Sequence, residues 1–236
     1  MLYWFNFNGI DSRTMGVTMN EPVPMMRGKE RVQRQTIPGR EGTLTLTEGA
    51  NIYDPYVQTL KISVRGASNV PRVKKWLRGR HYVIFHSEPD RRQIAAVENE
   101  IKLEKLSRNL DVWQGVIQFY CDPLKEPLAQ ATEELTAGLY TNVGDAAEKP
   151  ILIFNGSGNT TFTVDGKAFT LTGIPDGGCI VDCNAKEVLT ADGERTITEI
   201  SSGDFPEFPE GISDVSWTQP NIGSITVTVV RRVVYL

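Results

Sequence analysis

Turn signals recur along this chain of 236 residues and cut it into short runs in which apolar and polar residues alternate. In the second half, the turn sequences Asp165–Gly166 and Asp176–Gly178 separate such runs at a spacing of about 8 to 12 residues. Alternation with a period of two is that of a half-buried strand, and regularly spaced short strands are typical of a β-sandwich or jelly roll. A longer alternating run, Gln93–Leu106, predicts one continuous strand. The sequence therefore predicts a mainly β protein.

One segment departs from this pattern and predicts the single helix of the chain. Ser68 or Asn69 caps its start, and Gly79 ends it. Its apolar residues Val73 and Trp76 fall on one side. Because so short a helix is unstable alone, we expect this apolar side to lie on a sheet.

The two halves of the chain carry opposite charge. Residues 1–125 hold 19 basic and 13 acidic residues, a net charge of +6, whereas residues 126–236 hold 6 and 16, a net charge of −10, which together give the −4 of the whole chain. The segment Leu124–Leu135 contains Pro127 and three Glu and predicts an exposed connector. We therefore expect two domains, residues 1–125 and residues 126–236.

Several broad functions are disfavoured by composition. Apolar runs stay well short of about 18 residues, so we expect no membrane insertion. Basic residues are scattered between carboxylates without interleaved aromatic residues, so we expect no direct recognition of a nucleic-acid sequence. The start, Met1–Asn6, lacks the features of a secretion signal, and three cysteines are an odd number, which fits a protein made in a reducing cytoplasm.

The residues that could carry chemistry lack the required spacing. His81 and His86 have no nucleophile-elbow sequence to work with. Cys179 and Cys183 lack a second Cys or His pair for zinc, and buried thiols are the better interpretation. One loop holds three carboxylates that could bind a hard cation or act as acid and base, but solvated charges explain them more simply: Asp204, Glu207 and Glu210. We expect no enzyme activity, no metal and no cofactor.

A tight reversal between two alternating runs is the strongest candidate for an interface. Glycines allow a positive φ, and proline suits a strand end. Two interpretations are open: a plain surface turn with solvated charges, or a rigid tip that docks on a neighbouring chain. The residues of this candidate partner interface are Ile37, Pro38, Gly39, Arg40, Glu41 and Gly42.

Trp217 is the candidate for a glycan contact. An indole ring on the face of a sandwich can stack on a sugar, although an isolated strand tryptophan more often belongs to the core.

Several short stretches occur in a fixed order along the chain. They are Phe5–Ser12, Ile37–Gly42, Val73–Leu77 and Phe119–Pro123 in the first half, and Thr141–Gly144, Pro150–Ile153 and Gly203–Pro206 in the second. In their order and spacing, the stretches of the first half resemble the amino-terminal domain of siphophage distal tail proteins, and those of the second half resemble the remainder of those proteins. The resemblance covers essentially the whole chain.

The resemblance implies a structural protein of a phage or prophage tail tip or baseplate, assembled in the cytoplasm of the bacterial host. Residues 1–125 would form a tail-tube-like β-sandwich with one helix and a protruding hairpin. Residues 126–236 would form a peripheral galectin-like β-sandwich. Six copies would form a ring, with or without stacking of rings. The implied partners are the protein itself, the tail tube protein, and tail-tip and receptor-binding proteins.

An alternative from another functional class is a carbohydrate-binding adhesin module that recognises a host cell-wall glycan. A native mass separates the two hypotheses, because a hub assembles and a binding module need not. A glycan array tests the alternative directly.

Overall fold

The computed structural model describes residues 3–39, 41–47, 52–219 and 224–236. The chain divides into two compact units, Met1–Leu128 and Ala129–Tyr235, each with its own hydrophobic core. The sequence placed the division between residues 125 and 126. Strands dominate both units, and one α-helix is present among the described residues, so the predicted mainly β fold class is confirmed.

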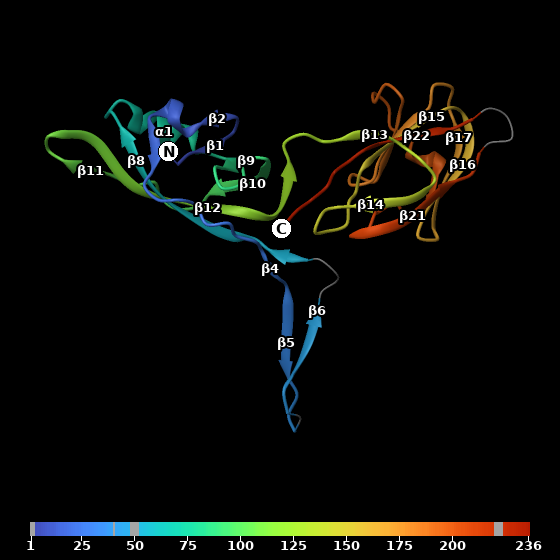
Figure 1. Ribbon diagram of the computed structural model, residues 1–236, viewed down its shortest axis with the longest axis horizontal. Helices are drawn as coiled ribbons and strands as arrows, with labels where there is room; N and C mark the ends of the chain where they lie inside the picture. The colour runs from blue at the N-terminus through green and yellow to red at the C-terminus, as the bar shows by residue number, and fades with distance from the viewer. Residues whose placement is uncertain (1–2, 40, 48–51, 220–223) are drawn as a thin grey trace. The chain divides into compact units, whose positions relative to one another are not determined.

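Unit 1 is built on an eight-stranded antiparallel sheet (Figure 1). Its order is β2-β1-β9-β10-β12-β8-β3, and β11 also pairs with β12. The strands are β1 (Phe5–Phe7), β2 (Ile10–Asp11), β3 (Val17–Met19), β8 (Tyr56–Arg65), β9 (Arg80–Phe85), β10 (Arg91–Val97), β11 (Leu103–Ser107) and β12 (Leu110–Pro127).

The helix α1 (Asn69–Trp76) lies against this sheet, as its apolar side predicts. Trp76 is buried, stacks on Phe5 with ring centroids 5.4 Å apart, and donates from Nε1 to the carbonyl oxygen of Phe7 at 2.9 Å. The predicted capping differs in detail. The Ser68 side chain makes no capping hydrogen bond, and Asn69 instead donates from Nδ2 to the carbonyl oxygen of Arg65 at 2.8 Å. A short 3-10 helix, η1 (Ser12–Met15), precedes β3.

The run Gln93–Leu106 does not form one strand, which corrects the sequence prediction. It is split into β10 and β11, which both pair with β12. Asn99 lies in the break, and its side chain supplies the hydrogen bonds that strand pairing would otherwise make. Its Nδ2 donates to the carbonyl oxygen of Val116 at 2.9 Å, and its Oδ1 accepts from the Gln118 N–H at 2.7 Å. The side-chain amide satisfies backbone groups that would otherwise lack partners.

The connector predicted over Leu124–Leu135 is mostly strand. β12 continues to Pro127 because Lys125 and Glu126 pair with Gln93 and Arg92 of β10, and β13 (Thr132–Leu135) starts soon afterwards. The segment outside strands is residues 128–131.

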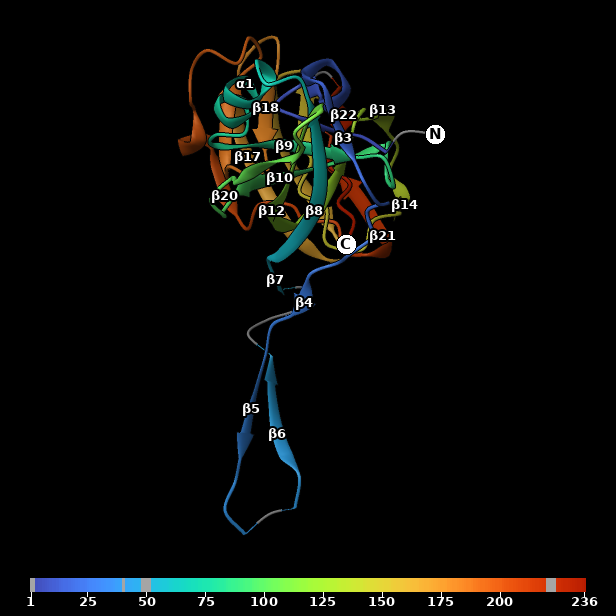
Figure 2. The same cartoon turned by 90° about the vertical axis from the view of Figure 1, so that its left-hand side faces the viewer.

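A separate ribbon leaves unit 1 between β3 and β8. It begins with the short pair β4 (Lys29–Glu30) and β7 (Tyr53–Asp54) and continues as the hairpin β5 (Val32–Thr36) and β6 (Thr43–Thr47). Figures 1 and 2 show this hairpin projecting away from the eight-stranded sheet.

Unit 2 is a sandwich of two five-stranded antiparallel sheets, with strand orders β13-β22-β15-β18-β19 and β14-β21-β16-β17-β20. The sheets share one core, in which Phe154 and Phe162 meet edge to face at 5.8 Å. A 3-10 helix, η2, spans Thr198–Ile200. The strands not yet given are β14 (Gly138–Asn142), β15 (Ile151–Asn155), β16 (Gly158–Val164), β17 (Lys167–Ile174), β18 (Cys179–Asp182), β19 (Glu187–Thr190), β20 (Ser201–Gly203), β21 (Gly211–Trp217) and β22 (Thr226–Val230).

None of the helices in the described parts of the chain has the length and apolar character needed to cross a membrane.

Candidate interaction surfaces

The base of the hairpin is packed directly on β12. Gly28, which precedes β4, is buried, and a Cβ added there would lie 2.6 Å from the carbonyl oxygen of Asp54 and 2.6 Å from Cβ of Pro123. Any side chain would therefore force the base of the hairpin off the sheet. Close backbone contact fixes the point from which the hairpin leaves unit 1.

A buried lysine reinforces this anchor. Lys125 is 3% exposed, and its Nζ donates to the carbonyl oxygen of Met26 at 2.8 Å and to Oε2 of Glu88 at 2.7 Å. At the surface of the base, Nε of Arg31 donates to Oδ1 of Asp54 at 2.7 Å. The segment that leads into the hairpin is therefore held by Lys125 of β12, which is itself paired with Glu88 in the turn between β9 and β10.

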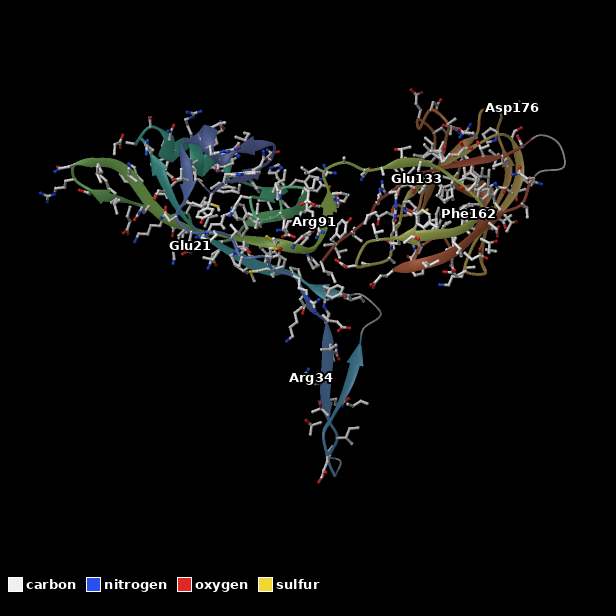
Figure 3. The ribbon with its side chains drawn as sticks, viewed as in Figure 1. Glu21, Arg34, Arg91, Glu133, Phe162 and Asp176 are labelled. Atoms are coloured by element: carbon white, nitrogen blue, oxygen red, sulfur yellow. The ribbon has the colours of Figure 1, made fainter. Side chains whose placement is uncertain are left out.

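The hairpin arms, by contrast, are mostly open to solvent where their side chains are described. Alternation along Thr43–Thr47 predicts a strand with one buried side, but Leu44 is 36% exposed and Gln35 opposite it is also exposed. Arg34, which Figure 3 labels on this arm, is exposed as well. Two-stranded hairpins are marginally stable in water, and three or more strands or a packing partner are usually needed. The arms thus present a surface that unit 1 does not cover.

The tip has the backbone that the sequence predicts. Gly39 and Gly42 have φ values of +79° and +82°, and a Cβ added to either would meet no atom within 4 Å. Pro38 and Glu41 are exposed and Ile37 is half-buried. The sixth residue of the predicted interface, Arg40, lies outside the described residues. Docking of this tip on a neighbouring chain stays a prediction.

Trp217 lies at the margin of the unit 2 core. Its ring stacks on Phe162 with centroids 6.2 Å apart and an interplanar angle of 18°, and its Nε1 donates to the carbonyl oxygen of Ile225 at 3.2 Å. One face and the polar atom of the indole are thus used inside the sandwich. Figure 3 shows Phe162 among the side chains between the two sheets. The glycan contact stays a prediction.

The other residues considered for chemistry are spread over both units. The rings of His81 and Phe7 meet edge to face with centroids 5.5 Å apart, and the rings of His86 and Tyr3 are tilted with centroids 4.9 Å apart. Asp204, Glu207 and Glu210 are exposed, and Glu207 is paired with Nζ of Lys149 at 3.0 Å.

The cysteine thiols are buried and free, as the sequence indicated. Burial raises the pKa of Cys121 and of Cys179 to about 12 and also raises the pKa of Cys183. These thiols therefore stay protonated near neutral pH and are poor nucleophiles.

Sequence reasoning missed the most elaborate polar group of unit 2, which surrounds Glu148. This carboxylate is fully buried and accepts hydrogen bonds from the Tyr140 hydroxyl at 3.0 Å, from Nη2 of Arg231 at 3.2 Å and from the Arg232 backbone N–H at 2.9 Å. Arg232 in turn binds both carboxylate oxygens of Asp182, at 2.7 and 2.9 Å. The group ties the segment after β22 to the sandwich, and its members are too far apart in sequence for a local pattern to reveal them.

Comparison with solved structures gave an informative likeness. No protein-family model and no curated protein matches the sequence. Among solved structures, the crystal structure of the SPP1 Dit (gp 19.1) protein, described as a paradigm of the hub adsorption apparatus in phages that infect Gram-positive bacteria, matches with a TM-score of 0.77 and 20% sequence identity. The match covers 98% of this chain and 99% of that one.

This chain has the fold of SPP1 Dit. The Dit likeness extends over both units, so it includes the eight-stranded sheet, the hairpin and the sandwich rather than one shared domain. It confirms, at the level of the fold, the resemblance to siphophage distal tail proteins that the short sequence stretches carry. At 20% identity the Dit fold is what the two chains share, and function is a separate question.

Proposed function

We propose that this protein is a non-enzymatic structural hub of a phage or prophage tail tip, which forms a six-membered ring and joins the tail tube to the host-adhesion proteins. The observation that carries the proposal is the match of nearly the whole chain to a hub protein of a phage adsorption apparatus. A likeness restricted to one sandwich would be common to many unrelated proteins, because few folds host many functions.

The hairpin supports a role in assembly. Its base is anchored through Gly28 and Lys125, whereas most of the described side chains of its arms and tip are exposed. A preorganised projection loses little conformational freedom on binding, which favours its use as a contact. In this proposal the tip inserts against the next copy around the ring, and ring closure requires two different complementary faces on each subunit.

The alternative, a carbohydrate-binding adhesin, receives less support from the geometry. Its candidate platform, Trp217, has one ring face on Phe162 and its N–H on Ile225. Unit 2 is then a peripheral sandwich to which adhesion proteins attach, rather than a lectin.

Native mass spectrometry of the purified full-length chain tests the proposal. We expect a species with the mass of six chains, which becomes more populated as protein concentration rises. A chain that stays monomeric at the highest soluble concentration contradicts the ring. A monomer that also gives saturable binding on a cell-wall glycan array would favour the adhesin instead.

A further inference from the structure

Two strongly exposed apolar side chains lie together on the outer face of unit 2. Leu139 on β14 is 79% exposed and Ile212 on β21 is 68% exposed. The strands pair Leu139 with Asp214 and Thr141 with Ile212, so Leu139 and Ile212 are diagonal neighbours on one face. Such neighbours lie about 7–8 Å apart, within reach of long side chains. We call this the β14–β21 face; Figure 1 shows the two strands side by side.

Three carboxylates lie beside this apolar pair. Asp214 lies directly across from Leu139, and Glu210 precedes Ile212 by two residues. Asp165 is adjacent, because its Oδ1 accepts the Asp214 N–H at 2.8 Å. Within the described residues, no ion pair joins these three carboxylates to a lysine or arginine. An apolar centre with an acidic rim fits a partner that presents long cationic side chains.

Helix α1 of unit 1 has the complementary character. The segment Asn69–Arg80 contains no acidic residue. Lysine and arginine carry aliphatic stems that cover apolar surface while the charged ends reach neighbouring carboxylates. The outer side of the helix and the residues just after it present four exposed cations, for which the described residues supply no ion-pair partner: Arg72, Lys74, Lys75 and Arg78.

We propose that the β14–β21 face of one copy docks on α1 of a second copy. Unit 2 holds 15 acidic and 6 basic residues, so two β14–β21 faces would repel one another. The cationic helix offers the opposite sign in a segment without acidic residues, and pairing it with the acidic apolar patch makes a head-to-tail contact. The inference rests on the proposed ring and adds a second contact to it, separate from the hairpin.

Charge reversal on each surface tests the contact in the full-length chain. The helix variant carries Lys74→Glu, Lys75→Glu and Arg78→Glu, and the face variant carries Glu210→Lys and Asp214→Lys. We expect each variant alone to weaken self-association by about tenfold or more in light scattering, because like charges then meet. An equimolar mixture of the two variants restores association. A reversal of equal size at Lys102, Lys105 and Arg108 on the β11 hairpin is the control and leaves association unchanged.

The outcomes separate this contact from the ring itself. The inference is overturned if wild type assembles, Gly39→Val with Gly42→Val prevents assembly, and both charge variants still assemble; the ring then stands on the hairpin alone. It is also overturned if the mixture gives no rescue although circular dichroism shows both variants folded. A wild-type chain that never assembles overturns the contact and the ring together.

A cross-link locates the contact directly. The native cysteines are buried, so a chain with Lys75→Cys and Ile212→Cys forms disulfides mainly through the two new thiols. We expect oxidation to give a ladder of linked chains on a denaturing gel. A monomeric band with both new thiols linked would place the contact within one chain, and a band without linkage would place no contact there; either result overturns the inference.

Discussion

Lys125 reaches back to Met26, 99 residues earlier in the chain, and donates from Nζ to its carbonyl oxygen at 2.8 Å. The same ammonium group contacts Glu88 at 2.7 Å, and the lysine side chain is 4% exposed. A charge so deeply buried is stable only when it is paired and hydrogen-bonded. The contact therefore links the end of the longest strand to the segment that carries the hairpin.

Replacing Lys125 with Met should lower the free energy of unfolding by about 3–5 kcal/mol, because the Met26 carbonyl loses its donor and the Glu88 carboxylate is left with the longer contact to Arg91 at 3.7 Å. Urea denaturation of the full-length chain measures the change. Lys102→Met is the matched control, since that lysine side chain is 78% exposed and its loss should change stability by less than about 0.5 kcal/mol. Equal effects of the two substitutions would argue against the anchor.

Valine at both Gly39 and Gly42 should prevent assembly while the two cores stay folded. Each position has a positive φ with free space around it, so the substitution strains the turn by about 1–3 kcal/mol without a steric clash. Light scattering measures assembly, and circular dichroism measures folding. Gly193→Val imposes the same kind of strain at one position in a turn of unit 2, where φ is +76°, and should leave assembly intact. If the hairpin variant still forms rings, the hairpin is not part of the interface.

The pair between Asp182 and Arg232 should contribute stability that depends on pH. Burial by itself would raise the pKa of Asp182, but hydrogen bonds from Arg232 and from the Ala185 N–H hold that pKa below its ordinary value. The folded state therefore binds this proton less readily than the unfolded state does. The resulting stability is complete above about pH 4, the unfolded pKa, and is lost as the pH falls through the folded pKa.

The difference in unfolding free energy between wild type and Asp182→Asn should accordingly be largest at neutral pH and shrink below about pH 4. Guanidinium denaturation at a series of pH values measures it. Asp176 is exposed on a loop, as Figure 3 shows, so Asp176→Asn is the control and should differ little from wild type at any pH. A difference for Asp182→Asn that is independent of pH would contradict the assignment.

Trp217→Ala should destabilise unit 2 by about 2–3 kcal/mol, less than a fully buried tryptophan costs, because the ring is half-buried against Phe162. Trp217→Phe keeps the ring contact and loses the hydrogen bond to Ile225, so we expect a smaller loss. Thermal unfolding ranks the variants. We expect the wild-type chain to give no saturable binding on a glycan array. Binding that both substitutions abolish would favour the alternative function as a carbohydrate-binding adhesin.

Local signals predicted a large part of the fold. Alternation marked the strands, and the apolar stripe with a terminal glycine marked the helix. Gly39 and Gly42 marked the tip of the hairpin, where the structure gives both a positive φ. Each of these features depends on residues a few positions apart, so the sequence pattern contains it.

Long-range contacts decided what those signals missed. Asn99 interrupts a run that alternates well, because its side-chain amide forms hydrogen bonds with the backbone of Val116 and Gln118 on β12. β12 also continues beyond Pro123, although proline normally ends a central strand, because Lys125 and Glu126 pair with residues of β10. Propensity is a weak guide wherever a distant partner supplies the hydrogen bond.

Periodicity and turn chemistry are properties of neighbouring residues, and from them alone this chain is predicted to be a β protein with one helix and a hairpin. The prediction of two domains came from the opposite charge of the two halves and from the predicted connector. The burial of Glu148 with Tyr140 and Arg231, the anchoring of Met26 by Lys125, and the exposure of Leu44 on an alternating strand came only from the tertiary structure. Whether a side chain is buried depends on which distant segments cover it, and that is decided by packing over the whole unit rather than by spacing along the chain.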